Sequence, residues 1–128
     1  MSEGNILQAP ALECSCIMYR AARKRWVQQV ERSDVILPDA FLLRAQESGL
    51  SVRPARRVSP GQCAAGLAGC TRVLSLHVGR VRNIGLQVVA DAEDHAEIQG
   101  LPHRSENAAE AERLASLLAV QARIIRVA

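Results

Sequence analysis

The sequence predicts a single α+β domain: a small mixed or antiparallel sheet of four to five strands with two to three helices. Short segments with the apolar alternation of strands recur along the chain, most clearly over Arg72–Val78. A capped amphipathic helix follows near the C-terminus and is expected to pack on the sheet. The length of 128 residues suits one domain.

The composition is that of an ordinary folded protein, except that aromatic residues are scarce. Hydrophobic residues make up 48% and charged residues 23% of the chain, close to the averages for globular domains. Only Tyr19, Trp26 and Phe41 are aromatic. The net charge is a modest +3, and nine basic residues against six acidic ones fall within residues 1–60. This distribution is compatible with a charged ligand surface in the first half of the chain but does not require one.

Neither a targeting segment nor a membrane span is recognisable in the sequence. Residues 1–11 lack the basic region and apolar run of a secretory signal. No apolar stretch approaches the roughly 18 residues of a membrane span. We therefore expect a cytoplasmic protein with no membrane partner, in which residues 1–16 form a loosely ordered leader and residues 17–128 form the domain.

Six segments have the composition or the alternation of strands. Arg72–Val78 and Leu86–Ala90 are expected to be central in the sheet, and the second of these is expected to pair with His95–Gln99 around an acidic turn. The remaining segments are Ile17–Arg20, Leu50–Arg53 and Asp39–Arg44, the last of which also fits a short helical turn.

Helices are expected where a capping residue precedes a suitable run. Ser59 and Pro60 suit the N-cap and first position of a helix reaching about Gly69 or Cys70. Ala21–Val30 is expected to form a short basic helix, and Arg80–Ile84 a helical turn ended by Gly85.

The C-terminal helix has the clearest signals. Asn107 with Glu110 three residues later forms a variant of the capping box. The apolar residues that follow recur at helical spacing: Ala111, Leu114, Ala115, Leu117 and Leu118. This helix is expected to cover the sheet.

The cysteines predict buried free thiols, and no metal site is expected. In a helix, Cys63 and Cys70 would lie about 10 Å apart along the axis, too far for a disulfide or for one shared zinc. The Cys14-x-Cys16 spacing differs from the usual zinc pairs. The chain also lacks a Walker loop, a dinucleotide fingerprint and a nucleophile elbow, so no Ser–His–Asp arrangement is assigned.

Two groups of polar residues are candidates for a site. His95 and Glu97 share one strand face and could act as acid and base, or they could form the solvated side of a half-buried strand. The second group is basic and could contact nucleic acid or a partner protein, or it could be a solvated face. Its members are Arg23, Lys24, Arg25, Arg53, Arg56 and Arg57.

Several stretches resemble a family of small uncharacterised bacterial proteins. The matching pieces are Leu37–Arg44, Gly49–Val52, His95–Ile98 and the closing helix Ala111–Arg123. This resemblance implies one compact domain with an ordered C-terminal helix. The family supplies no activity that could be assigned to this chain.

A fainter likeness is to small toxins of the ADP-ribosyltransferase type. They carry an Arg at the end of a first strand, a Ser on a second strand and an acid on a later one, and Arg20, Ser51 and Glu97 occur in that order here. The likeness implies that Arg20 holds the phosphates or the ribose of NAD and that Glu97, or His95 beside it, activates the sugar. The usual Ser-Thr-Ser run is absent, and the chain is short for that fold.

Two functional hypotheses follow. The first is a non-enzymatic binding or accessory module of a bacterial operon or toxin–antitoxin system, with a partner protein from a neighbouring gene or a nucleic acid as its ligand and no cofactor. The alternative is a small transferase-like toxin that uses NAD, with Arg20, Ser51, His95 and Glu97 as its catalytic residues.

Overall fold

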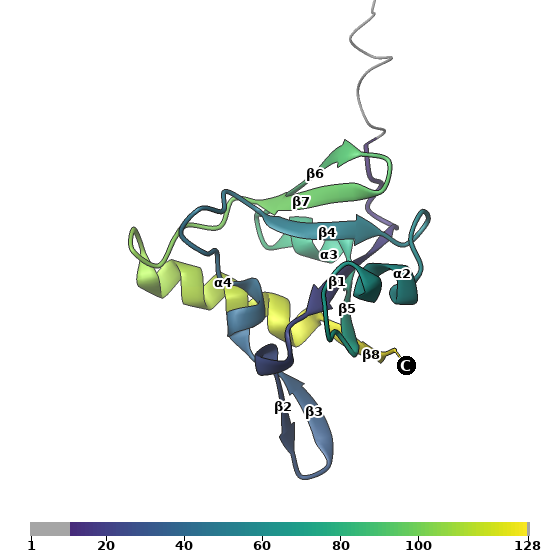
Figure 1. Cartoon of the computed structure of the whole chain (residues 1–128). Coiled ribbons are helices and arrows are strands. Elements are labelled where there is room, and N and C mark those ends of the chain that lie inside the picture. The colour runs from purple at the N-terminus through teal and green to yellow at the C-terminus, as the bar shows by residue number, and fades with distance from the viewer. Residues whose placement is uncertain (1–10, 128) are drawn as a thin grey trace, which may run out of the picture.

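Six antiparallel strands form the main sheet of the computed structural model, which describes residues 11–127 (Figure 1). In spatial order they are β6 (Gln87–Ala92), β7 (His95–Gln99), β4 (Leu50–Pro54), β1 (Ile17–Ala22), β5 (Arg72–His77) and β8 (Arg123–Arg126). The predicted α+β class is confirmed. The predicted number of four to five strands is too low, because β8 and a separate two-stranded sheet were not expected.

The two strands expected at the centre of the sheet are not both central. β5 lies between β1 and β8, but β6 is an edge strand that pairs only with β7 among the described residues. The burial of β6 explains this, since Val88 is buried whereas Val89 is 41% exposed. One apolar face is enough for an edge strand, and the centre is formed by β4 and β1.

The segment expected to be a basic helix forms a turn and a hairpin instead. A single 3₁₀ turn, η1 (Lys24–Trp26), is followed by β2 (Val27–Val30) and β3 (Ser33–Ile36), which pair with each other. Glu31 and Arg32 connect them with φ angles of 50° and 71°. These are the left-handed angles of a tight two-residue hairpin turn.

The helices are short except for the last. α2 (Pro60–Ala65) has the expected cap at Ser59, but it ends before the expected Gly69 or Cys70. α3 (Val78–Asn83) begins directly after β5. α4 (Ala108–Gln121) is confirmed with its cap, since the Asn107 side chain accepts a hydrogen bond from the Glu110 N–H.

Helices lie on both faces of the sheet (Figure 1). The main core lies between one face of the sheet and α4, together with α3 and the 3₁₀ turn η2 (Pro38–Phe41). Its fully buried side chains include Met18, Phe41, Leu50, Leu74, Leu76, Ile98 and Leu118. On the other face a smaller cluster joins Val73 to Val58, Cys63 and Ala64 of the α2 region. This second face also carries the side chains of Ser51 and His95.

The expected leader is described only from Ala11; residues 1–10 lie outside the described part. Leu12 is buried in the main core. The Val78 N–H donates to the Cys16 carbonyl and the Gly79 N–H to the Cys14 carbonyl, at 3.0 and 2.9 Å. None of the helices described is long and apolar enough to cross a membrane.

Candidate functional site

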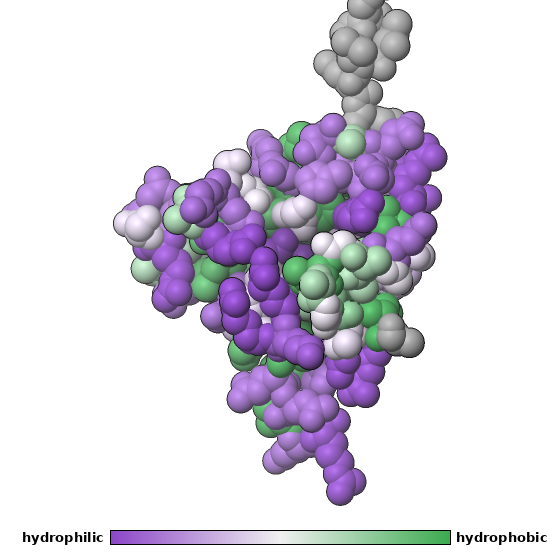
Figure 2. Space-filling model, viewed as in Figure 1, coloured by the Kyte–Doolittle hydropathy of each residue, from purple (hydrophilic) through white to green (hydrophobic). Residues whose placement is uncertain are grey.

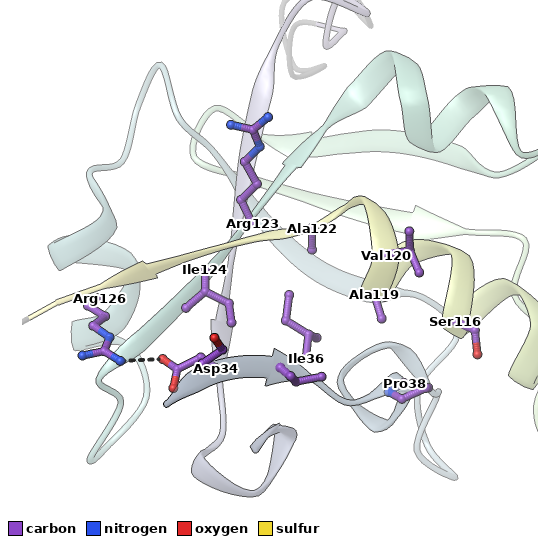
Figure 3. Close-up of a pocket in the computed structure, with 12 residues that line it drawn as sticks. Asp34, Ile36, Pro38, Ser116, Ala119, Val120, Ala122, Arg123, Ile124 and Arg126 are labelled. Carbon is purple, nitrogen blue, oxygen red and sulfur yellow. Dashed lines mark ion pairs between the residues drawn. The ribbon is translucent and has the colours of Figure 1, made fainter. Parts of the chain in front are cut away.

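Two large hollows open on the described surface, and the larger one is mainly apolar. It has a volume of about 820 Å³ and lies between β3, the end of α4 and β8, where Ile36 and Ile124 point into it (Figure 3). Asp34 at its rim is bound by Arg126, at 3.3 Å, and by Arg72, at 2.7 Å. Its lining contains neither histidine nor cysteine. Histidine and cysteine side chains line the second hollow instead.

The second hollow, here called the Arg20 cavity, has a volume of about 500 Å³. It lies where β1 and β4 separate beyond the pair of Tyr19 and Arg53. In the space-filling view from the same side, the surface over α2 is less polar than the surface over the β6–β7 hairpin, which is largely hydrophilic (Figure 2). The polar and aromatic lining residues are Tyr19, Arg20, Arg23, Trp26, Arg44, Glu47, Ser51, Arg53, Cys63, Asp94 and His95.

Arg20 is a buried charge, with only 6% of its surface exposed. Its Nε donates to the Ala40 carbonyl at 2.8 Å and its Nη1 to the Ser51 carbonyl at 2.9 Å. Strands β1 and β4 pair only at Met18 and Tyr19, so the Arg20 side chain fills the gap where the strands separate. Burial lowers the pKa of this guanidinium to about 10, which still leaves it charged at neutral pH.

Arg20 and Arg23 both stack on the indole of Trp26. Their Cζ atoms lie 5.0 and 5.7 Å from the ring centroid, within cation–π range. Within the described residues neither guanidinium forms an ion pair, and the buried Nε of Arg23 has no hydrogen-bond partner. Buried charges in proteins are normally paired. The buried Arg20 is not, and Arg23 beside it is partly buried.

The other charges of the cavity are paired. Arg44 lies 3.5 Å from Glu47, and Arg53 donates to the Asp94 carboxylate at 3.1 Å. Four arginines and two carboxylates thus line the Arg20 cavity, and Arg20 and Arg23 are the two of these arginines that form no ion pair among the described residues.

A hydrogen-bonded serine, histidine and aspartate lie at one wall of the cavity. The Ser51 Oγ is 2.5 Å from His95 Nε2, and His95 Nδ1 is 2.6 Å from Asp91 Oδ1. We call this the Ser51–His95–Asp91 array. The sequence analysis assigned no Ser–His–Asp arrangement because the chain lacks a nucleophile elbow. The structure corrects that inference, since three different strands supply the residues.

A bulge in the β6–β7 hairpin accounts for the position of Asp91. Ala90 pairs with Ala96 and Ala92 pairs with His95, so Asp91 is the extra residue between two paired positions. A bulge re-aims the side chain of its strand. Ser51 and His95 come from the adjacent strands β4 and β7, which pair at Ser51 and Glu97. The position of Asp91 four residues before His95 carries no signal in the sequence.

Three of the four predicted catalytic residues line the Arg20 cavity: Arg20, Ser51 and His95. Glu97 lies next to them on β7 and pairs with Ser51 across the sheet, but it is absent from the cavity lining. Its Oε1 accepts a hydrogen bond from the Gln99 side chain at 3.2 Å.

The predicted basic surface is divided into two groups. Arg23, Lys24 and Arg25 follow β1, and all three line a third hollow beside residues 67–70. Arg56 and Arg57 lie at the opposite end of β1, since the Ala55 N–H donates to the Ile17 carbonyl. Arg57 lies 3.7 Å from Glu93.

Cys14, Cys16, Cys63 and Cys70 are all free thiols, and burial raises the pKa of Cys63. Over residues 11–127 no group of three or more His, Cys, Asp and Glu side chains is placed to hold a metal ion. Comparisons of the chain with protein-family models, curated proteins and solved structures return no match.

Proposed function

We propose that this protein binds a phosphate-bearing small molecule of the nucleotide class in the Arg20 cavity. The observation that carries the proposal is the buried Arg20 guanidinium, which forms no ion pair within residues 11–127 and lies beside Arg23, whose buried Nε has no hydrogen-bond partner there. Guanidinium groups bind phosphate through parallel N–H donors, and the two hydrogen bonds of Arg20 leave other donors unused.

An anion would offset the desolvation of Arg20 and would pair with the neighbouring Arg23. A charge removed from water is stabilised when an opposite charge meets it in the same site, and this interaction is stronger away from bulk solvent. The cavity volume of about 500 Å³ lies in the range of small-molecule sites. Trp26 adds an aromatic group at the wall.

NAD is the first ligand to test. The likeness to ADP-ribosyltransferase-type toxins implies it, and the lining of one cavity by Arg20, Ser51 and His95 favours it. A transfer from NAD needs an acid near the sugar, and Glu97 beside His95 is the residue we assign to that role under this alternative.

The single tryptophan makes binding measurable without a label. Trp26 lies in the cavity wall and is the only tryptophan in the chain. We expect pyrophosphate, ADP and NAD to change its fluorescence with saturation, and to raise the melting temperature as any ligand of the native state does. Adenosine, which lacks phosphate, is expected to bind far more weakly.

Arg23→Gln is expected to weaken ADP binding at least tenfold, because a hydrogen bond to a charged group contributes about 1.5–3 kcal/mol. Arg25→Gln is the matched control, since Arg25 is exposed on the same 3₁₀ turn and does not line the cavity. Equal weakening of ADP binding by both substitutions would contradict a defined site. The proposal would also be contradicted if pyrophosphate, ADP and NAD changed neither the Trp26 fluorescence nor the melting temperature of the folded protein.

A further inference from the structure

The Ser51–His95–Asp91 array fixes the imidazole in one tautomer. The Asp91 carboxylate can only accept, so His95 Nδ1 carries the proton and donates to Asp91 Oδ1. His95 Nε2 is then the acceptor, and it faces the Ser51 hydroxyl at 2.5 Å. A base held in this way withdraws the proton from a serine hydroxyl as the oxygen attacks.

The main chain around Ser51 is held on both sides. On one side β4 pairs with β7 at Ser51 and Glu97, and on the other the Arg20 guanidinium binds the Ser51 carbonyl. Leu50 and Val52, which flank Ser51, are both buried in the core. The hydroxyl therefore projects from a rigid strand, and its Oγ faces the cavity.

The surroundings favour an anionic electrophile. The same cavity is lined by Arg20, Arg23, Arg44 and Arg53, and positive groups stabilise the charge that develops on the oxygens of a transferring phosphoryl group. An uncharged acyl substrate would make no use of the two unpaired guanidinium groups.

We propose that Ser51 is a nucleophile that attacks phosphoric esters, with His95 as its general base and Asp91 as the residue that positions His95. The Oγ–P bond forms and the P–O bond to the leaving alcohol breaks. The Ser51 proton passes to His95 Nε2 and from there to the leaving oxygen. Water then attacks the phosphoserine, gives one proton through His95 to the Ser51 oxygen, and inorganic phosphate leaves.

The choice of a phosphoryl group rests on the proposed phosphate binding, whereas the nucleophile rests on the array alone. A fluorophosphonate probe separates the two. Ser51 displaces fluoride from its phosphorus, and the adduct is located by peptide mass spectrometry.

Labelling is expected at Ser51 in the wild type, is lost in Ser51→Ala, and is slowed at least 100-fold in His95→Gln. Asp91→Asn is expected to slow it at least tenfold, because the tautomer is no longer enforced. Ser75→Ala is the matched control, since Ser75 lies on the same face of the sheet as Ser51 and pairs with Tyr19 across β1 and β5. This substitution is expected to leave the labelling of Ser51 unchanged.

The nucleophile is refuted if Ser51 remains unlabelled in a protein that melts cooperatively, or if labelling is equally fast in His95→Gln. The phosphoryl assignment is tested separately. Release of nitrophenol from p-nitrophenyl phosphate by the unlabelled protein supports it. If Ser51 reacts with the probe but the unlabelled protein releases nitrophenol from p-nitrophenyl acetate and not from the phosphate, the assignment is overturned.

Discussion

Arg20 occupies a position on β1 where strand alternation alone calls for an apolar residue. Its neighbours on that face, Met18 and Ala22, are buried at 0% and 2% exposure. A charged residue in phase with core residues is a signal that sequence reasoning can use, and here it marks the cavity. Its partners could not be predicted, because Ala40 and Ser51 bind it through main-chain carbonyls that any residue provides.

Asp91 shows why the rest of the site could not be predicted. An acidic residue in a hairpin turn is ordinarily a solvated turn residue. Only the bulge between Ala90 and Ala92, a feature of pairing and not of composition, directs Asp91 toward His95.

Asp34 gives a prediction at the same scale. Its side chain is 7% exposed, and its hydrogen bond from Arg72 is the main cause that lowers its pKa below the ordinary 3.8. A carboxyl whose pKa is lower in the folded state stabilises the fold above its unfolded pKa, and this contribution is lost as the pH falls through the folded pKa. Asp34→Asn is therefore expected to lower the melting temperature at pH 7, by an amount that shrinks below pH 3.8.

The matched control for Asp34 is Asp39→Asn, an exposed carboxyl with no ion pair among the described residues. Melting curves measured from pH 7 down to pH 2.5 test the prediction. A melting-temperature difference for Asp34→Asn that stays constant across this range would contradict it.

Elements that capping residues or apolar periodicity mark in the sequence were predicted. The β2–β3 hairpin, which forms through the pairing of two strands, was not. The cap at Asn107 and the stripe of α4 agree with each other, and the helix has the expected start. The β2–β3 hairpin was missed because its turn residues are Glu31 and Arg32, and neither is the Asn or Gly that usually marks such a turn.

This unusual turn leads to a prediction at the element scale. A residue with a side chain in the left-handed region is destabilised by roughly 1–2 kcal/mol relative to Gly. Replacing Glu31-Arg32 by Asn-Gly is therefore expected to raise the free energy of unfolding by about 1–2 kcal/mol, measured in urea.

The β6–β7 turn is the control for this replacement. Glu93 and Asp94 connect those strands without positive φ angles, so placing Asn-Gly there is expected to bring no gain. A larger gain at residues 93–94 than at residues 31–32 would be inconsistent with strain at the β2–β3 turn.

For the whole molecule, the candidate site draws on both faces of the sheet where β1 and β4 separate. The face under α4 holds most of the apolar core and carries Arg20, and the opposite face carries Ser51 and His95. The α+β class could be predicted from the sequence because the apolar periodicity of strands and helices appears within short segments. It misjudged the strand order, since β4 and β1 became central through contacts between segments more than 25 residues apart in the chain.

The central claim is that phosphate binds at Arg20 and Arg23. The most direct measurement follows the arginine Nε–H signals across the whole protein by ¹H–¹⁵N NMR during titration with ADP. With signals assigned by single Arg→Lys substitutions, the account predicts that Arg20 and Arg23 shift first and saturate together, while Arg113 on α4 and Arg104 in the turn before it stay unchanged. Saturating shifts confined to other arginines, or uniform weak shifts across all of them, would contradict it.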